Sequence, residues 1–567
     1  MKGFFFILIL IFFSAFFAGK IYAFDPSRPN NIVGIHLAQP RDEDLRSAAK
    51  LVNSSGGDWG YVTLVIQEND RDHDKWQAIF DSLRELHLIP IIRLATNPEG
   101  SNWRRPNPED AANWANFLDS LNWVVKDRYI VLFNETNHAT EWGGAVDAAS
   151  YASIAKTFAE ELKKRNSDYF IMLGGLDASA PSAGTNYESE DEYLPEVISY
   201  MGKDSFETLF DGLSSHSYPN PGFAGSPTDT GRGTVRNYEW ELSLLKNMGI
   251  NKDLPVFITE TGWSANAVSR DAIGAYLKTA YKEVWKPDNR VRAVTPFVLN
   301  YQADPFLGFS WEKQDSADFY SQYADIQSME KTQGRPEQIE KARFVLDFPR
   351  QLTVTSDFHL TFMVENLGQS IWSVDDDYKL GFRNGFPGSY FFSDIQKLKP
   401  FETTKVNLYL KTDGTIGNKT ATLTLLHGDR QVGPETSWNY EQVPWPSAQL
   451  KVLLYPKVRT DGGDFTFQLF DTNEELVFQR KNVDVAQGQA LVGDIRNIAF
   501  GKRYRAVILK SYYLPRQTYL IFHKGQNDIA FPFMLPLDFN NDGKFDVSDL
   551  VALIQNLSLL SLLFPQN

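Results

Sequence analysis

The chain has 567 residues, with 71 acidic and 56 basic side chains and a net charge of −15. This acidic balance argues against a nucleic-acid partner, because phosphates are bound by Lys and Arg. The sequence has no cysteine, which excludes disulfides, thiolate metal sites and thiol nucleophiles. Hydrophobic residues (43%) and aromatic residues (14%) are abundant enough for several cores, which excludes a mainly disordered chain.

Residues 1–23 have the layout of a secretory signal peptide. Lys2 precedes an uncharged apolar run from Gly3 to Gly19, and a short segment then ends in the small residue Ala23. We expect cleavage after Ala23, and a protein that is secreted or held at the cell surface. An uncleaved membrane anchor is the alternative, although the apolar run is short for spanning a bilayer.

Residues 24–336 alternate between apolar runs and helical patterns. The runs are apolar throughout, as expected of parallel strands buried on both faces. They cover 31–37, 61–66, 89–95, 129–135, 169–175, 210–218, 255–263 and 293–301. Segments between them, such as 75–87 and 151–165, repeat apolar residues at helical spacing. Eight strand–helix units predict a TIM barrel, the (β/α)8 fold. An open doubly wound sheet is the alternative, but no glycine-rich phosphate loop follows the first strand.

Two glutamates directly follow apolar strands of this region. The fourth strand ends in Asn134 and Glu135, and the seventh ends in Glu260. Catalytic groups of TIM barrels sit at the C-terminal ends of the strands. Burial and a like charge both raise a carboxyl pKa, so such a pair can hold one protonated and one ionised carboxyl group near neutral pH. A retaining glycosidase needs this equipment: one carboxyl group protonates the leaving oxygen and the other attacks the anomeric carbon.

The Asn134-Glu135 pair, combined with the sequence ITETGW around Glu260, resembles the retaining glycoside hydrolases of clan A. The cellulase, mannanase and β-xylosidase families of that clan are the most similar, and the resemblance covers about residues 31–330. It implies Glu135 as acid/base, Glu260 as nucleophile, and Asn134 as a hydrogen-bond partner of the sugar 2-hydroxyl. No cofactor is expected for this catalysis. Many clan members have proline where this chain has Thr136, which leaves the exact family and the sugar open.

Further residues near the strand ends are candidates for binding the sugar. His216 and Tyr218 stand two apart on the sixth strand and therefore point the same way. Arg93 follows the third strand and His36 the first. Trp263, just past Glu260, and Trp142, in the loop after the fourth strand, are candidates for a sugar-stacking platform. Clan members often have a tryptophan under the sugar at the end of the eighth strand, and Tyr301 or Trp311 is expected to take its place here. The complete set of binding candidates is Asn134, His216, Tyr218, Arg93, His36, Trp142, Trp263, Tyr301 and Trp311.

The expected substrate is a polysaccharide or an oligosaccharide. The sequence leaves open the linkage and whether the chain is cut internally or from an end. The alternative is a non-catalytic surface protein whose degenerate barrel binds glycan or cell wall. The sequence has no HExxH, P-loop, GxSxG or protein-kinase motif that would favour another reaction.

Two all-β domains are expected after the barrel. Residues 340–446 have short alternating strands separated by turn residues, which predicts a β-sandwich. Asn366, Gly368 and Trp372 in this region resemble an N-x-G-x-x-x-W motif of immunoglobulin-like modules, with Trp372 expected in the core. Residues 447–536 predict a second all-β domain.

Residues 537–567 contain a calcium-loop pattern, DFNNDGKFDVSD. Its expected oxygen ligands are the side chains of Asp538, Asn540, Asp542 and Asp549 and the carbonyl of Lys544. A helix with an apolar face follows the loop. Aspartate at the last ligand position makes this segment similar to a single repeat of a dockerin. The resemblance implies structural calcium and a cohesin or cell-surface scaffold as partner. A calcium-stapled domain end is the alternative.

Overall fold

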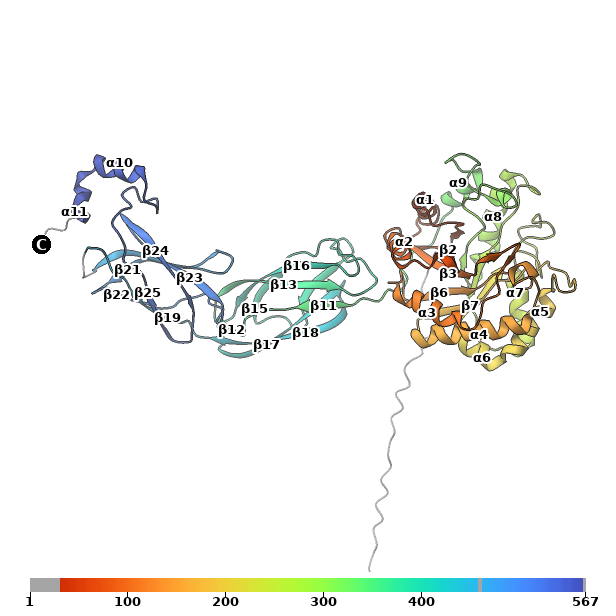
Figure 1. Cartoon of the computed structure of the whole chain (residues 1–567), viewed down its shortest axis with the longest axis horizontal. Helices are drawn as coiled ribbons and strands as arrows, with labels where there is room; N and C mark the ends of the chain where they lie inside the picture. Colours follow the sequence, from red (N-terminus) through yellow and green to blue (C-terminus); the bar gives the residue numbers. More distant parts are fainter. Residues whose placement is uncertain (1–30, 457–460, 564–567) are drawn as a thin grey trace, which may run out of the picture. The chain divides into compact units, whose positions relative to one another are not determined.

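The computed structural model describes residues 31–456 and 461–563, so the predicted signal peptide lies outside the described residues. The chain divides into two compact units at the boundary between Gln338 and Ile339 (Figure 1). Within the two described ranges, no helix is both long and apolar enough to cross a bilayer.

Unit 1 is built on eight parallel strands, and each predicted apolar run overlaps one of them, although the last strand shares only residues 293 and 294 with its predicted run. They are β1 (Gly34–His36), β2 (Gly60–Gln67), β3 (Leu88–Ala95), β6 (Arg128–Leu132), β7 (Tyr169–Leu173), β8 (Leu213–His216), β9 (Val256–Glu260) and β10 (Val291–Val294). Hydrogen bonds join β1-β2-β3-β6-β7 in one sheet and β8-β9-β10 in another. Val33 and Val294 form a parallel bridge next to β1 and β10. The spatial order of these strands follows their order in the chain, whereas a doubly wound sheet reverses its strand order at one point.

Helices connect these strands in sequence and lie on several sides of them (Figure 1). The α-helices are α1 (Asp42–Val52), α2 (His73–Glu85), α3 (Asp110–Ser120), α4 (Ala148–Arg165), α5 (Glu190–Met201), α6 (Lys203–Leu209), α7 (Asn237–Asn247), α8 (Arg270–Ala280) and α9 (Ser321–Ser328). Shorter elements are η1 (Glu68–Asp70), η2 (Ala139–Glu141), η3 (Tyr281–Trp285), η4 (Leu307–Phe309), β4 (Pro98–Glu99) and β5 (Asn102–Trp103). In α4 the residues Ile154, Phe158 and Leu162 are buried, as their four-residue spacing predicts.

Strands β6 and β9 position the two glutamates of interest. Both strands are buried along their whole length, which agrees with runs that are apolar throughout. β6 and β9 belong to different sheets, but the Val33–Val294 bridge joins the two sheets in parallel, so the segments after β6 and at the end of β9 share one edge of unit 1.

The first part of unit 2 has two four-stranded sheets that share one core. Their orders are β11-β13-β16-β15 and β12-β18-β17-β14. The strands are β11 (Ala342–Val345), β12 (Gln351–Thr353), β13 (Asp357–Asn366), β14 (Tyr378–Phe382), β15 (Gly388–Phe392), β16 (Thr403–Thr412), β17 (Gly417–His427) and β18 (Arg430–Val443). Trp372 is buried in this core, as predicted.

The remaining residues of the N-x-G-x-x-x-W motif hold the backbone around Trp372. The Asn366 side-chain amide donates to the carbonyls of Ser370 (2.8 Å) and Leu398 (3.1 Å). A Cβ atom at Gly368 would lie 2.5 Å from the Ile339 carbonyl oxygen, so only glycine fits there. The motif is therefore structural in this chain.

The second part of unit 2 has its own core between a three-stranded sheet, β22-β19-β25, and a four-stranded sheet, β21-β20-β23-β24. The strands are β19 (Ser447–Lys451), β20 (Gly462–Phe470), β21 (Leu476–Val485), β22 (Gln489–Val492), β23 (Arg503–Lys510), β24 (Tyr513–Ile521) and β25 (Gln526–Ala530). The helical elements α10 (Val547–Gln555), η5 (Leu557–Leu559) and α11 (Leu560–Leu563) follow.

Candidate active site

The turn after β6 carries Asn134 and Glu135. Phe133 (φ 70°) and Glu135 (φ 33°) have left-handed backbone conformations, which end the strand earlier than the apolar run predicts. The Glu135 amide donates to the Gly175 carbonyl at 2.9 Å and so ties this turn to the segment after β7. Strained backbone of this kind is typical of functional sites.

Glu260 is the last residue of β9, and its carboxylate is held by two donors. Arg93 Nη1 donates to Oε1 at 2.8 Å, and the Tyr218 hydroxyl donates to Oε2 at 2.9 Å. The residue is only 8% exposed. Burial by itself would raise the pKa of Glu260, but the charges of His216 and Arg93, together with the Tyr218 hydrogen bond, lower it below its ordinary value. Glu260 is therefore ionised at neutral pH.

His216 lies between the two glutamates. Its Nδ1 atom is 2.9 Å from Glu135 Oε1 and 4.0 Å from Glu260 Oε2. Burial opposes a charge on this imidazole, but the two carboxylates raise the pKa of His216 above its ordinary value. A Cβ atom at Gly175 would lie 2.2 Å from the ring, so the glycine after β7 is what makes room for it.

The three side chains converge closely. One donor atom each from Glu135, His216 and Glu260 lie within 4.8 Å of one another. Within the described parts of the chain, this is the only such group of three His, Asp or Glu side chains. The two strand ends thus bring two carboxylates face to face, with an imidazole bridging them.

Arg93 and His36 complete the surroundings of Glu260. Arg93 Nη1 also donates to the Asn134 side-chain carbonyl, so one guanidinium positions both residues. His36 Nε2 lies 3.7 Å from Glu260 Oε1, and burial lowers the pKa of His36 to about 3, which keeps the ring neutral. Among the described residues, neither ring nitrogen of His36 has a hydrogen-bond partner, although both are buried.

Glu141, in η2, is a third carboxyl group in this site that the sequence patterns did not single out. Burial is the main cause that raises the pKa of Glu141 to about 7; the charge of Glu135 adds to this, whereas the charge of Arg93 and a hydrogen bond with Asn134 oppose it. Glu141 does not directly follow a strand, so the strand-end pattern in the sequence could not identify it. A glutamate six residues after the fourth-strand Glu was the available signal.

The expectation that tryptophans stack on the sugar is wrong. Trp142, Trp263 and Trp311 are 0%, 2% and 2% exposed, so their ring faces are covered by protein. Trp142 packs edge-on against Phe133 and Tyr151 in the core. The indole of Trp263 donates to the Gly225 carbonyl at 2.8 Å and therefore has a structural role.

Phenylalanines and Tyr301 occupy the rim instead. His36 contacts Phe297 edge-on at 5.1 Å, Phe297 contacts Phe306 at 5.2 Å, and Phe306 contacts Tyr301 at 5.3 Å. Phe306 is one of the exposed large side chains of unit 1. The signal for this row was the phenylalanine-rich stretch after the eighth strand, which lacks the expected tryptophan.

No family model matches this chain, and no curated protein matches it. Solved structures similar to it include a family 39 glycoside hydrolase from Bacteroides cellulosilyticus, with 14% identity and TM-score 0.38, covering 83% of this chain and 80% of that one. A β-xylosidase from Caulobacter crescentus has 11% identity and TM-score 0.38, covering 85% and 97%. A β-mannanase from Thermomonospora fusca has 13% identity and TM-score 0.35, covering 53% and 90%. All three TM-scores are below 0.5, so these similarities carry no argument about function.

The predicted calcium loop is a closed turn built by its own acidic side chains. The two carboxylate oxygens of Asp538 accept the amides of Asp542 (2.9 Å) and Gly543 (3.0 Å). Those of Asp549 accept the amides of Asn540 (3.3 Å) and Asp546 (2.8 Å). Asp538 and Asp549 are buried, and burial followed by neighbouring negative charge raises the pKa of Asp538. Inward-facing oxygen donors of this type fit a hard cation.

Proposed function

We propose that this chain is an exported glycoside hydrolase whose unit 1 is a (β/α)8 barrel of the clan A type. It would cleave O-glycosidic bonds of a polysaccharide or oligosaccharide with retention of configuration. The observation that carries the proposal is the approach of the Glu135 and Glu260 carboxylate oxygens to within 4.8 Å. Retaining enzymes place the two carboxyl groups about 5–5.5 Å apart, whereas inverting enzymes leave about 6.5–9.5 Å for a water molecule.

Glu260 suits the role of nucleophile because it is ionised and held. Arg93 and Tyr218 each donate to one carboxylate oxygen, which fixes the orientation of the group for attack on the anomeric carbon. The attack forms a bond between a Glu260 oxygen and the anomeric carbon as the bond to the leaving oxygen breaks. The Tyr218 hydroxyl keeps its proton and so continues to donate to Glu260, because burial and nearby carboxylates raise the pKa of Tyr218 well above its ordinary value.

Glu135 suits the role of acid and base. Its side chain is more exposed than that of Glu260, so a leaving oxygen and then a water molecule can reach it. In the first step it gives a proton to the leaving oxygen, and in the second it takes a proton from the water that releases the sugar. The hydrogen bond from His216 positions the Glu135 carboxyl group.

Two polar groups beside the glutamates, half-buried Asn134 and buried His36, are available for the hydroxyls of the sugar. Asn134 is fixed by Arg93 beside both glutamates, which suits a hydrogen bond to the 2-hydroxyl. The unpartnered ring nitrogens of His36 would be satisfied by a hydroxyl of the bound sugar, because a buried polar group without a partner costs free energy. The exposed ring of Phe306 and the neighbouring Tyr301 offer apolar contact at the rim.

The C-terminal segment would bind calcium as a structural ion through Asp538, Asn540, Asp542, the Lys544 carbonyl and Asp549, with no part in catalysis. The apolar residues at the end of the loop and after it also support a protein partner. Val547, Leu550, Ile554 and Leu557 are all exposed, with Ile554 at 71%. An uncovered apolar helix face of this kind is typical of a binding surface, which fits a cohesin or another cell-surface scaffold. Residues 1–23 support export.

The test is a hydrolysis assay of the purified full chain on a panel of β-glucans, mannans and xylans. Wild type is expected to release reducing ends from at least one of them, and Glu135→Gln and Glu260→Gln to release none. A Glu260→Ala variant is expected to regain activity with azide and to yield an inverted glycosyl azide. If wild type cleaves no polymer of the panel, the hydrolase activity proposed for unit 1 is wrong; if either Gln variant keeps the wild-type kcat, the role given to that residue is wrong.

A further inference from the structure

The outer face of the sheet β11-β13-β16-β15 carries a row of three aromatic rings. Strand register places His359 of β13 directly opposite Tyr409 of β16, and Tyr409 opposite Phe391 of β15. The rings stack nearly parallel: His359 and Tyr409 at 4.4 Å and 12°, Tyr409 and Phe391 at 4.6 Å and 12°. Each ring is therefore held by its neighbour, and the row is rigid.

The row ends in an open ring face at the edge of the sheet. β15 is an edge strand, and Tyr409 covers only the side of Phe391 that faces β16. Phe391 is 61% exposed, although phenylalanine side chains usually lie on the core face of a sheet. The opposite face of this ring is thus free to stack on a flat apolar surface of a ligand.

The row lines a groove of about 760 Å³ within unit 2, a volume in the range of ligand-binding sites. The facing wall is the turn between β20 and β21, including Asp471, Thr472, Asn473 and Glu475. Glu475 reaches His359 Nδ1 at 3.3 Å, so the two walls are linked across the groove. Hydroxyl, amide and carboxylate groups thus border an aromatic platform.

Both lysines that line the groove lie beside aspartates and Arg503 stacks on the Tyr519 ring, which disfavours a strongly acidic ligand. Lys502 lies 2.8 Å from Asp347, and Lys411 lies 3.9 Å from Asp357. Asp471 accepts the backbone amides of Asn473 (2.8 Å) and Glu475 (2.9 Å). An uncharged ligand with many hydroxyls and a flat C–H face matches this lining: hydroxyls can share the paired polar groups, and the C–H face can stack on Phe391.

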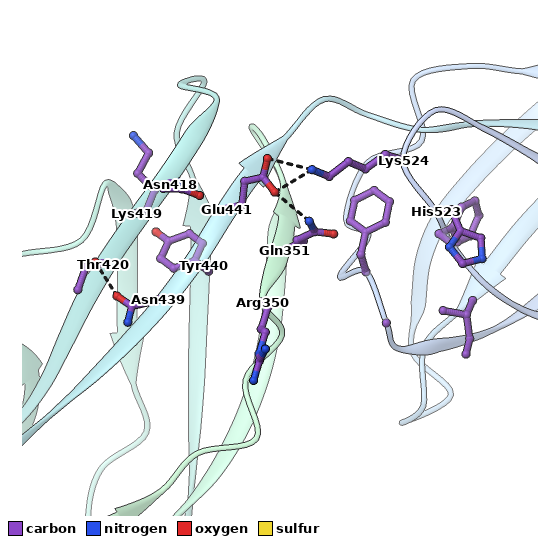
Figure 2. A pocket seen from close by; sticks show the side chains of 14 residues that line it. Arg350, Gln351, Asn418, Lys419, Thr420, Asn439, Tyr440, Glu441, His523 and Lys524 are labelled. Carbon is purple, nitrogen blue, oxygen red and sulfur yellow. Dashed lines mark hydrogen bonds and ion pairs between the residues drawn. The ribbon is translucent and has the colours of Figure 1, made fainter.

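A second groove in unit 2 lacks such a platform. Figure 2 shows it between β18 and the segment after β24, where Lys524 reaches the Glu441 carboxylate at 2.8 Å. Its Tyr440, Phe500 and Phe522 rings are buried, and its exposed His523 ring stacks on no other aromatic ring among the described residues, so no row of rings forms there. The contrast singles out the groove with the aromatic row.

We propose that the Phe391–Tyr409–His359 groove binds a neutral glycan chain, as a carbohydrate site separate from the glutamate pair. Phe391 supplies the stacking face, Tyr409 and His359 keep it in place, and the β20–β21 turn supplies polar contacts. The site needs no catalytic group, so its existence does not depend on the hydrolase activity proposed for unit 1. Its consequence is that unit 2 holds the protein on a polymer.

The test uses the full chain with Glu260→Gln in the background, so that no polymer is consumed. Native gels containing neutral hydroxyethylcellulose, glucomannan or arabinoxylan are expected to retard this protein. Adding Phe391→Ala removes the stacking ring, and losing the lower end of the value of burying a phenylalanine side chain corresponds to roughly tenfold weaker binding at this site. Phe391→Trp is expected to restore retardation. The matched control is Phe401→Ala, since Phe401 is equally exposed (62%) in the same unit but is not part of the groove.

Hydrogen exchange places the site independently of unit 1. With the retarding polymer present, segments 388–392 and 403–412 are expected to gain protection, and Phe391→Ala to abolish that gain. In chains with an intact Glu260, Phe391→Ala is expected to leave kcat on a short soluble oligosaccharide unchanged, so a failed hydrolase assay and a failed binding assay are distinguishable. Equal retardation of the Phe391→Ala and Phe401→Ala proteins, or no protection of these strands with any of the three polymers, would overturn the proposal.

Discussion

Replacing Tyr218 with phenylalanine tests the hydrogen bond that holds Glu260. The substitution keeps the ring and removes one hydroxyl that donates to Glu260 Oε2 at 2.9 Å. A hydrogen bond to a charged group is worth about 1.5–3 kcal/mol, and one pKa unit corresponds to about 1.4 kcal/mol. The pKa of Glu260 should therefore rise by about 1–2 units in Tyr218→Phe.

The sign of the effect on activity follows from the role of Glu260. The nucleophile must be ionised, and its pKa is below the ordinary value in the folded chain. When one donor is lost, the ionised form begins at a higher pH, so the acid limb of kcat/KM moves upward by the same 1–2 units. The activity on the alkaline side is expected to fall less than that on the acid side.

The assay is the kcat/KM–pH profile of wild type and variant on one soluble substrate. Tyr301→Phe is the matched control, because it removes the same atom at the rim of the site. Its acid limb is expected to stay in place. An unmoved acid limb in Tyr218→Phe would refute either the hold of Tyr218 on Glu260 or the need for an ionised Glu260.

Three further outcomes follow from other groups. Glu141→Gln removes a carboxyl group whose pKa is raised by burial to about 7, so the ionisation near pH 7 is expected to disappear from the kcat/KM–pH profile. Glu141→Asp keeps a carboxyl group and is expected to retain that ionisation. Superimposable profiles of wild type and Glu141→Gln would contradict the prediction. Glu190 and Glu241 are buried together, and burial raises both pKa values, with the charge of Glu241 raising that of Glu190 further. Because the pKa of Glu190 is raised in the folded state, the wild type loses stability as the pH rises above the unfolded pKa of about 4.3. The gain in unfolding free energy of Glu190→Gln is therefore expected to grow from pH 5 to pH 8, by at most about 1.4 kcal/mol per pH unit. A gain that is independent of pH in urea titrations would argue against the buried pair. Chelation of calcium is expected to speed hydrogen exchange across 538–557 and leave hydrolysis unchanged, and Asp538→Ala to do the same; a calorimetric titration without calcium binding would exclude the ion.

The strands and the glutamates at their ends could be predicted because each signal is local. An apolar run marks a buried strand, and this held for β6 and β9, although β6 ends at Leu132, before the apolar run does. The four-residue repeat of Ile154, Phe158 and Leu162 likewise fixed the buried face of α4.

The side chains around the glutamates were harder to predict because they depend on turns. Glu141 is brought to the site by η2 and by left-handed residues at Phe133 and Glu135, and bulky or acidic side chains give little warning of such conformations. The tryptophans were misassigned for a different reason. From its sequence position alone, a tryptophan after a catalytic strand fits sugar stacking and core packing equally well. The side chains that surround it in the folded protein decide between the two roles.

The aromatic row on β13, β15 and β16 depends on register. His359, Phe391 and Tyr409 are distant in sequence, and a shift of one residue in either pairing would turn one ring to the other face. Alternation predicts that the strands have two different faces but not which residues meet across them. The groove therefore becomes visible only in the folded structure.

The most direct test of the double-displacement proposal is the configuration of the first product. Proton NMR can follow the anomeric signals during hydrolysis of a soluble substrate, before mutarotation mixes the anomers. Attack by Glu260 followed by water requires two inversions at the anomeric carbon, so the first-formed product is expected to keep the configuration of the substrate. A first product of inverted configuration would contradict the assignment of Glu260 as nucleophile, even if both glutamates proved essential.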